Sequence, residues 1–339
     1  MGVWQDAPGV RIQGSRESSK AMQDVLQTAA GLVLLVAAAD LLVKGASSIA
    51  SRYGVSPLMI GLTVVSFGTS MPEMLVSVTA GLQGSADLAV ANVLGSNLFN
   101  ILVVLGVAAM IYPLHVHSST VVSEIPFSLS AAILLGFLAN AALFATKHEL
   151  SISRLDGGIL LLFFLLFMMY IFSISSPPGS DESPAPVTHS VSRSVAFIMA
   201  GIVGLYLGGE WAVQGAVALA RGWGVGDAVI GLTIIAIGTS LPELMASAMA
   251  AYRKEADIAV GNVVGSNIFN ILWILGVTAS IKKLPFDAIS NFDIVMVIVA
   301  TMLILLAVVT SRSATISRTW GGIFVCIYIA YMVYVVQRS

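Results

Sequence analysis

The second half of this 339-residue chain repeats the first half. When the sequence is shifted by 170 positions, residues 61–107 align with residues 231–277 without a gap, and 26 of the 47 aligned residues are identical. A duplication of this length indicates that the fold is built from two copies of one structural unit. Most of the identity lies in two short blocks, which are Gly-Thr-Ser-x-Pro-Glu at 68–73 and 238–243, and Gly-Ser-Asn-x-x-Asn at 95–100 and 265–270.

Each copy contains five apolar runs of the length that crosses a bilayer, about 20 residues each. Because five is odd, the second copy must enter the membrane from the opposite side, which predicts an inverted-topology repeat. We therefore expect an all-α multi-pass membrane protein with ten transmembrane helices, arranged as two inverted-topology five-helix repeats. The repeats occupy 25–174 and 193–339, after a polar tail at 1–24, and a proline-rich, acidic segment at 175–192 is expected to be a flexible linker. The expected helices cover 25–50, 55–82, 86–112, 120–146, 152–174, 193–220, 226–252, 256–281, 290–310 and 318–336.

The composition indicates that lipid is the main solvent of this chain. Hydrophobic residues make up 57% and charged residues 10%, and the mean hydropathy is +0.94, whereas a soluble domain has about 25% charged residues. A net charge of −2 gives no basis for binding nucleic acid. The first apolar run is too long for a signal peptide, so we interpret it as a retained span of a cell (plasma) membrane protein. The basic residues divide seven to nine between the two sides and leave the orientation of the termini open.

Two of the expected helices should be interrupted inside the membrane. Pro72 removes the donor that the carbonyl of Gly68 would use in a helix, and its ring clashes with that carbonyl. Pro242 and Gly238 repeat the arrangement in the second copy. Backbone carbonyls freed within a bilayer need another partner, and a bound cation can supply it.

An acidic residue lies beside each expected break. Glu73 and Glu243 are costly at mid-membrane and are therefore functional candidates. The repeat axis should bring the two together near the middle of the membrane. Together with neighbouring amides and hydroxyls they offer hard oxygen ligands, of which calcium takes about 6–8. The four histidines lie in expected loops or the linker, so soft or imidazole-bound metals are not expected. They are His115, His117, His148 and His189.

These blocks resemble the paired alpha-repeats of the calcium/cation antiporter superfamily, and in particular its prokaryotic sodium/calcium exchangers. The resemblance implies that the first and sixth helices slide against the rest to alternate access. It also implies an ion-binding set in which Glu73 and Glu243 bind both calcium and sodium, and Asn100 and Asn270 lie at the centre. Backbone carbonyls would come from Thr69, Thr239, Ser66 and Ala236. Hydroxyls that mostly bind sodium would come from Ser70, Ser240, Ser96 and Ser266.

The resemblance also favours a particular pair of ions. Proton/calcium relatives typically have Gly-Asn where this chain has Thr69-Ser70 and Thr239-Ser240, which favours sodium as the coupled ion. Potassium-dependent members carry Asp at the position of Asn270, so the Asn argues against potassium cotransport and leaves the ion count open. We expect Ca²⁺ and Na⁺ as transported ions, no cofactor, and no obligatory protein partner in the bilayer.

Other interpretations of the same residues remain open. The first rival function is a proton/calcium antiporter of the same fold, or one that carries another divalent cation such as magnesium or manganese. A passive cation channel and an intramembrane enzyme follow. Asp40 and Lys44, four residues apart, are expected to form an ion pair, whereas Gln214 takes the place of that lysine beside Glu210. Several polar residues near the blocks are expected to pack helices rather than bind ions: Ser77, Ser247, Asn92, Asn262, Asn97 and Asn267.

Overall fold

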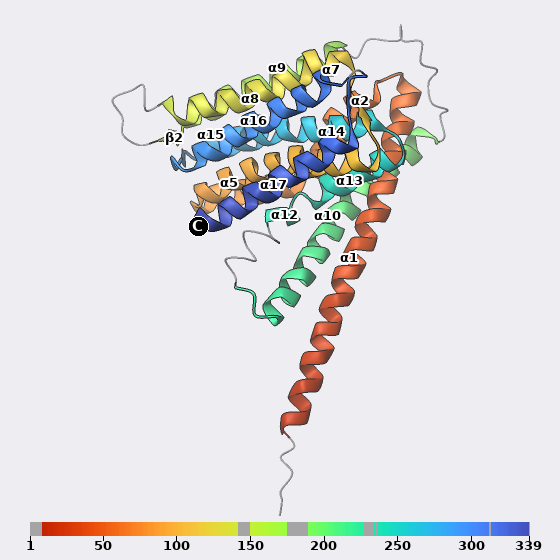
Figure 1. Ribbon diagram of the computed structural model, residues 1–339, viewed down its shortest axis with the longest axis vertical. Coiled ribbons are helices and arrows are strands. Elements are labelled where there is room, and N and C mark those ends of the chain that lie inside the picture. Colours follow the sequence, from red (N-terminus) through yellow and green to blue (C-terminus); the bar gives the residue numbers. More distant parts are fainter. Residues whose placement is uncertain are drawn as a thin grey trace, which may run out of the picture.

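A computed structural model describes residues 9–141, 150–174, 189–226, 234, 236–311 and 313–338. Within these ranges the chain is almost entirely helical (Figure 1). Eight helices are long and apolar enough to cross a membrane, and a bent pair, Pro57–Thr69 with Met71–Gln83, adds a ninth if it is one span. The expected seventh span at 226–252 is described only in part, and most of the expected linker at 175–192 lies outside the described residues.

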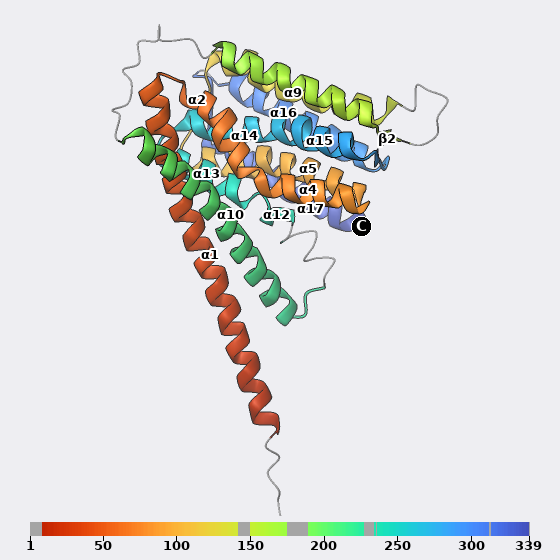
Figure 2. The same ribbon diagram turned by 180° about the vertical axis from the view of Figure 1, so that it is seen from behind.

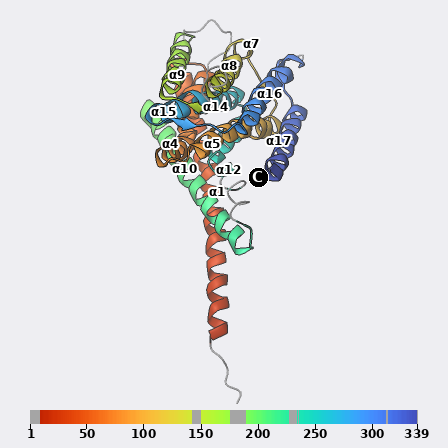
Figure 3. The same ribbon diagram turned by 90° about the vertical axis from the view of Figure 1, so that its left-hand side faces the viewer.

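Two long antiparallel helices, α1 (Gly9–Tyr53) and α10 (Val191–Gly222), lie side by side and extend beyond the other helices (Figures 1, 2 and 3). Glycines let their backbones touch: a Cβ at Gly208 would lie 2.9 Å from the Leu35 nitrogen, and one at Gly201 would lie 2.8 Å from the Leu42 nitrogen. Small residues of this kind allow close helix packing in lipid. The helix α1 begins at Gly9, within the expected polar tail, because the sequence has no proline between Pro8 and Pro57 to interrupt it.

The centre of the molecule is formed by two interrupted helices from each half. In the first half these are α2 (Pro57–Ile60), η1 (Gly61–Val65), α3 (Ser66–Thr69) and α4 (Met71–Gln83), followed by α5 (Ala86–Phe99), η2 (Asn100–Val104) and α6 (Leu105–Ile111). Their counterparts in the second half are α12 (Ala236–Gly238) and α13 (Leu241–Tyr252), followed by α14 (Ala256–Ile268), η5 (Phe269–Ile274) and α15 (Leu275–Ile281).

The remaining helices surround this centre and present apolar side chains outward. They are α7 (Ser118–Val122), α8 (Glu124–Ala139), α9 (Arg154–Ile174), α16 (Ser290–Val309) and α17 (Arg318–Arg338). In the apolar window of α14 to α15, 94% of the residues are buried, against 17–39% in α8, α9, α16 and α17. Exposed leucine, phenylalanine and valine side chains on these outer helices mark a lipid-facing surface.

Two short strand pairs connect the halves reciprocally. The strand β1 (Leu114–His115) pairs antiparallel with β4 (Thr315–Ile316), and β2 (Ser151–Ile152) pairs antiparallel with β3 (Leu284–Pro285). A shift of 170 residues carries β1 onto β3, and a shift of 164 residues carries Ile152-Ser153-Arg154, which begins in β2, onto Ile316-Ser317-Arg318, which begins in β4. Each sheet therefore joins the same two positions of the repeat with the halves exchanged, as a two-fold relation requires.

Candidate functional site

The interruption beside each Pro-Glu pair is present in both halves. In the first half Ser70 leaves helical geometry, with φ −83° and ψ 10°, and the helix bends by 50° there. Ser240 has nearly the same geometry, with φ −92° and ψ 8°. Pro72 and Pro242 lie in the first turn of the helix that follows, where a missing N–H costs little.

The two glutamates are completely buried, with exposed fractions of 0%. Glu73 and Glu243 lie in the first turns of α4 and α13, where the helix dipole favours a negative charge. Each is held by the other half: the Ser70 hydroxyl donates to Glu243 Oε1 at 2.8 Å, and the Ser240 hydroxyl donates to Glu73 Oε1 at 2.9 Å. Since each of these serines lies three residues before the other glutamate, both carboxyl groups share one site.

The neighbouring helices brace the broken ones through a repeated amide contact. Asn92 of α5 donates to the Glu73 carbonyl at 3.4 Å and to the Ser77 hydroxyl at 3.0 Å. In the second half Asn262 of α14 makes the same pair of bonds, at 3.4 Å to the Glu243 carbonyl and 2.9 Å to the Ser247 hydroxyl. The sequence predicted helix packing for these residues, and the bonds indicate how that packing fixes each glutamate's backbone.

Wider π-helical turns surround the second pair of asparagines. The turn η2 begins at Asn100 and η5 contains Asn270, and such turns are frequent at functional sites. Asn97 donates to the Asn267 carbonyl at 3.2 Å, and Asn267 donates back to the Asn97 carbonyl at 3.4 Å. Asn270 donates to Asn97 Oδ1 at 3.0 Å. No feature of the sequence predicted the π-helical turns or this exchange of amide bonds.

Buried oxygen atoms without a hydrogen-bond partner among the described residues gather around this centre. Buried polar groups are normally satisfied, so a concentration of unsatisfied oxygens indicates a binding site. Carboxylate, amide and hydroxyl oxygens are the ligands of hard cations. The atoms are Oε2 of Glu73 and Glu243, Oγ of Ser96 and Ser266, Oγ1 of Thr239, and Oδ1 of Asn100, Asn267 and Asn270.

The remaining members of the predicted set differ in their surroundings. Ser66 Oγ donates to the Leu62 carbonyl at 2.7 Å, and the Ser66 carbonyl accepts from Thr69 Oγ1 at 3.3 Å. Ala236 begins α12, as the counterpart of Ser66. The structure thus brings all six repeat-related pairs of the predicted set onto the broken helices and the helices beside them.

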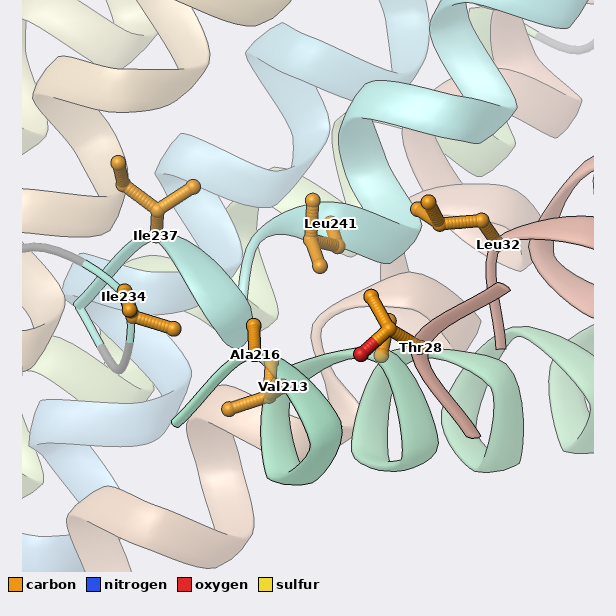
Figure 4. Close-up of a pocket in the computed structure, with 8 residues that line it drawn as sticks. Thr28, Leu32, Val213, Ala216, Ile234, Ile237 and Leu241 are labelled. Atoms are coloured by element: carbon orange, nitrogen blue, oxygen red, sulfur yellow. The ribbon is translucent and has the colours of Figure 1, made fainter. Parts of the chain in front are cut away.

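The repeat-related threonines Thr69 and Thr239 have different surroundings in the two halves. Thr69 Oγ1 donates to Asn262 Oδ1 at 3.1 Å and Thr69 is 1% exposed. Thr239 instead lines a cavity of about 180 Å³ between α4, α10 and the second break. A second, apolar pocket of about 280 Å³ separates α1 and α10 from α12 and α13, with Leu32 and Leu241 on opposite walls (Figure 4). The long helices therefore pack loosely beside the second break.

Removing the cross-half hydroxyls should destabilise the protein to a similar extent in either half. Ser70→Ala and Ser240→Ala each leave a buried carboxylate oxygen without its donor, which costs about 1–3 kcal/mol of unfolding free energy. Thermal unfolding of the purified protein in a chelator and without sodium measures the effect. Ser96→Ala is the control, since the Ser96 hydroxyl has no partner among the described residues. An equal loss in the control would contradict the expectation.

The expected ion pair outside the site is present. Lys44 Nζ lies 2.6 Å from Asp40 Oδ2, and Arg253, which the sequence did not suggest as a partner, also binds Asp40. Glu210 Oε1 accepts from Gln214 at 3.0 Å.

The comparisons with known proteins agree with one another. The family model described as sodium/calcium exchanger protein matches residues 24–173 and 193–337. The putative antiporter CaxA of Alkalimonas amylolytica is 40% identical over 310 residues, covering 89% of this chain and 95% of its own. The inner membrane protein YrbG of Escherichia coli is 40% identical over 270 residues, covering 77% and 80%. The structure of the sodium-calcium exchanger NCX_Mj soaked with 10 mM Na⁺ and no Ca²⁺ superposes with a TM-score of 0.79 at 30% identity, covering 92% of this chain and 99% of that one.

Proposed function

Because this chain belongs to the sodium/calcium exchanger family, we propose that it is a secondary active antiporter that exchanges Na⁺ for Ca²⁺ by alternating access. The predicted membership of the calcium/cation antiporter superfamily is confirmed, and the chain is a multi-pass membrane transporter rather than an enzyme. The observation that carries the proposal is the pair of buried glutamates, one from each half, surrounded by oxygens without partners.

The charge of the site supports exchange between these ions. Glu73 and Glu243 together neutralise one divalent cation, or two monovalent cations whose remaining coordination comes from hydroxyls and carbonyls. One set of ligands then serves both ions, and the two compete for it. Two ionised glutamates without cations repel each other in a medium of low dielectric, so an unloaded site is disfavoured during the passage across the membrane.

We assign the ligands by position in the repeat. Glu73 and Glu243 bind both ions, with backbone carbonyls from Ser66, Thr69 and their counterparts. The hydroxyls and the central amides complete the sodium positions. These last ligands are Ser70, Ser240, Ser96, Ser266, Asn100 and Asn270, whereas Ala236 and Thr239 contribute backbone carbonyls as the counterparts of Ser66 and Thr69.

The architecture that fits this mechanism has ten helices in two inverted repeats, at 25–174 and 193–339, joined by a linker at 175–192 and preceded by the tail at 1–24. The reciprocal bonds between Ser70, Glu243, Ser240 and Glu73 support such an axis. The close packing of α1 on α10, with the apolar pocket beside them, supports their sliding as one unit against the centre (Figure 4). We propose Ca²⁺ and Na⁺ as the transported ions, with no further protein required.

Sodium rather than proton coupling is proposed because Thr69-Ser70 and Thr239-Ser240 precede the glutamates. Purified protein in sodium-loaded liposomes should accumulate radioactive Ca²⁺ when diluted into sodium-free medium. The uptake should be at least about tenfold above that of liposomes without a sodium gradient. A pH gradient of the same size should drive no uptake. Uptake that follows the pH gradient and ignores sodium would instead assign the proton/calcium antiporter.

A further inference from the structure

A cavity of about 180 Å³ lies beside the second break, and we call it the mouth at this break. It is lined by residues of α4 and α10 and by residues of the break, including Thr239 and Pro242. Glu210 of α10 also lines it and is exposed. A carboxylate therefore lines the same cavity as Thr239, one of the proposed ion ligands.

The equivalent mouth beside the first break is closed. Shifting by 170 positions carries Val213, which is partly exposed, onto Val43, which has an exposed fraction of 0%. The counterpart of Thr239 is Thr69, which is bonded to Asn262. The two halves thus show the same mouth in two states, open in one half and shut in the other.

The repeat-related carboxylates have different partners in the two states. At the closed mouth, Asp40 of α1 is bonded to Lys44 and to Arg253, which follows the end of α13. This ion pair joins the long helix pair to the central helices. At the open mouth, Glu210 accepts a hydrogen bond from the neutral Gln214, which leaves its negative charge facing the cavity.

The bases of the closed mouth have no charged counterparts in the other half. Shifting by 170 positions carries Lys44 onto Gln214 and Arg253 onto Gln83 at the end of α4. Lys282, which approaches this end of α4, donates to the Leu82 carbonyl at 3.3 Å. Closing the open mouth in the same way would place Glu210 against a glutamine, so it would gain no ion pair.

We propose that Asp40 and Glu210 are gate carboxylates, which means that each controls access to the ion site at one of the two repeat-related mouths. This proposal rests on the proposed antiport. At an open mouth the carboxylate attracts the incoming cation. At a closed mouth a basic residue of the central helices forms an ion pair with the carboxylate, and this ion pair, which we call the lock, keeps the mouth closed. Because Arg253 provides such a lock and its counterpart Gln83 does not, the chain favours the state in which the mouth at Glu210 is open. The two gates are therefore unequal although the ion ligands between them are nearly symmetric.

The first test measures the electric field at the open mouth. Cys326 is replaced by serine, and Val213→Cys is added as a reporter in the cavity wall. The protein in detergent is labelled with methanethiosulfonates carrying a trimethylammonium or a sulfonate group. Glu210→Gln should lower the ratio of the cationic to the anionic labelling rate by about fivefold or more, since one nearby charge acts oppositely on the two reagents. Asp156→Asn, at the start of α9, is the control for a lost carboxylate. An unchanged ratio in Glu210→Gln overturns the attracting role.

The second test measures which mouth is open. Val43→Cys reports on the closed mouth and Val213→Cys on the open one, again without Cys326. Arg253→Gln should raise the labelling rate of Val43→Cys by about 3- to 5-fold, the size expected for one partly exposed ion pair. Gln83→Arg, which supplies the missing base, should lower the labelling of Val213→Cys by a similar factor. Lys254→Asn removes a neighbouring charge and should change neither rate. Unchanged rates in both Arg253→Gln and Gln83→Arg overturn the lock.

Neither test depends on calcium or sodium transport. Exchange that is abolished by glutamate substitution together with unchanged labelling would reject the gates and keep the antiporter. The expected labelling in a protein that moves no calcium would reject the antiporter and keep the two unequal mouths.

Discussion

Glu73→Gln and Glu243→Gln should each lower sodium-driven calcium uptake by at least about 100-fold. Each substitution keeps the shape and the acceptor for the cross-half serine but removes one of the two charges that balance Ca²⁺. A divalent ion in the site would then carry an uncompensated charge in a buried environment, which costs several kcal/mol. Initial rates of radiocalcium uptake into proteoliposomes with matched protein content measure the loss.

Glu124→Gln is the matched control for this experiment. Glu124 is also 0% exposed within an apolar helix, and it accepts a hydrogen bond from the Tyr170 hydroxyl at 3.0 Å, which an amide oxygen can also accept. It lies outside the proposed ligand set, so its substitution should leave uptake within about twofold of the unchanged protein. Sodium-driven uptake retained in both Glu73→Gln and Glu243→Gln would refute the proposed site.

Gly265→Val should reduce both stability and transport. A Cβ at this position would lie 2.7 Å from the Leu62 carbonyl oxygen and 2.7 Å from Ser66 Oγ, so α14 would have to move away from η1 and α3. Overpacking of this kind costs about 1–3 kcal/mol of unfolding free energy. Because Ser266 follows directly, the ligands would shift apart, and we expect transport to fall by at least about tenfold.

Gly322→Val is the control that separates this steric effect from the low helix propensity of valine. A Cβ at Gly322 in α17 meets no atom of the described residues within 4 Å. Thermal unfolding and calcium uptake of the two variants should therefore differ clearly. Equal behaviour would show that the contact between α14 and η1 does not position the site.

Local chemistry predicted the features that depend on a few adjacent residues. The break at Ser70 follows from Pro72 and Gly68, and the convergence of Glu73 and Glu243 is expected from the duplicated motif that carries them. The contact between Asp40 and Lys44 follows from their spacing along one helix.

Features that depend on distant parts of the chain could not be predicted in this way. The π-helical turns at Asn100 and Asn270 require neighbouring helices that favour a shifted backbone register. The bond between Arg253 and Asp40 joins residues 213 positions apart. Thr69 and Thr239 belong to nearly identical motifs yet differ in exposure, so the motif itself does not determine how exposed each threonine is.

The hydrogen bonds from the serine of each half to the glutamate of the other half determine what a gene for a single half could encode. Each half holds the acid of one motif and the hydroxyl that the other half's acid needs, so neither half contains a finished cation shell. A shortened gene that encoded a single half would specify a protein able to complete itself only by pairing with a second copy inserted upside down. We therefore expect a substitution that compensates for the loss of one glutamate to lie in the other half of the chain, about 170 residues away in sequence.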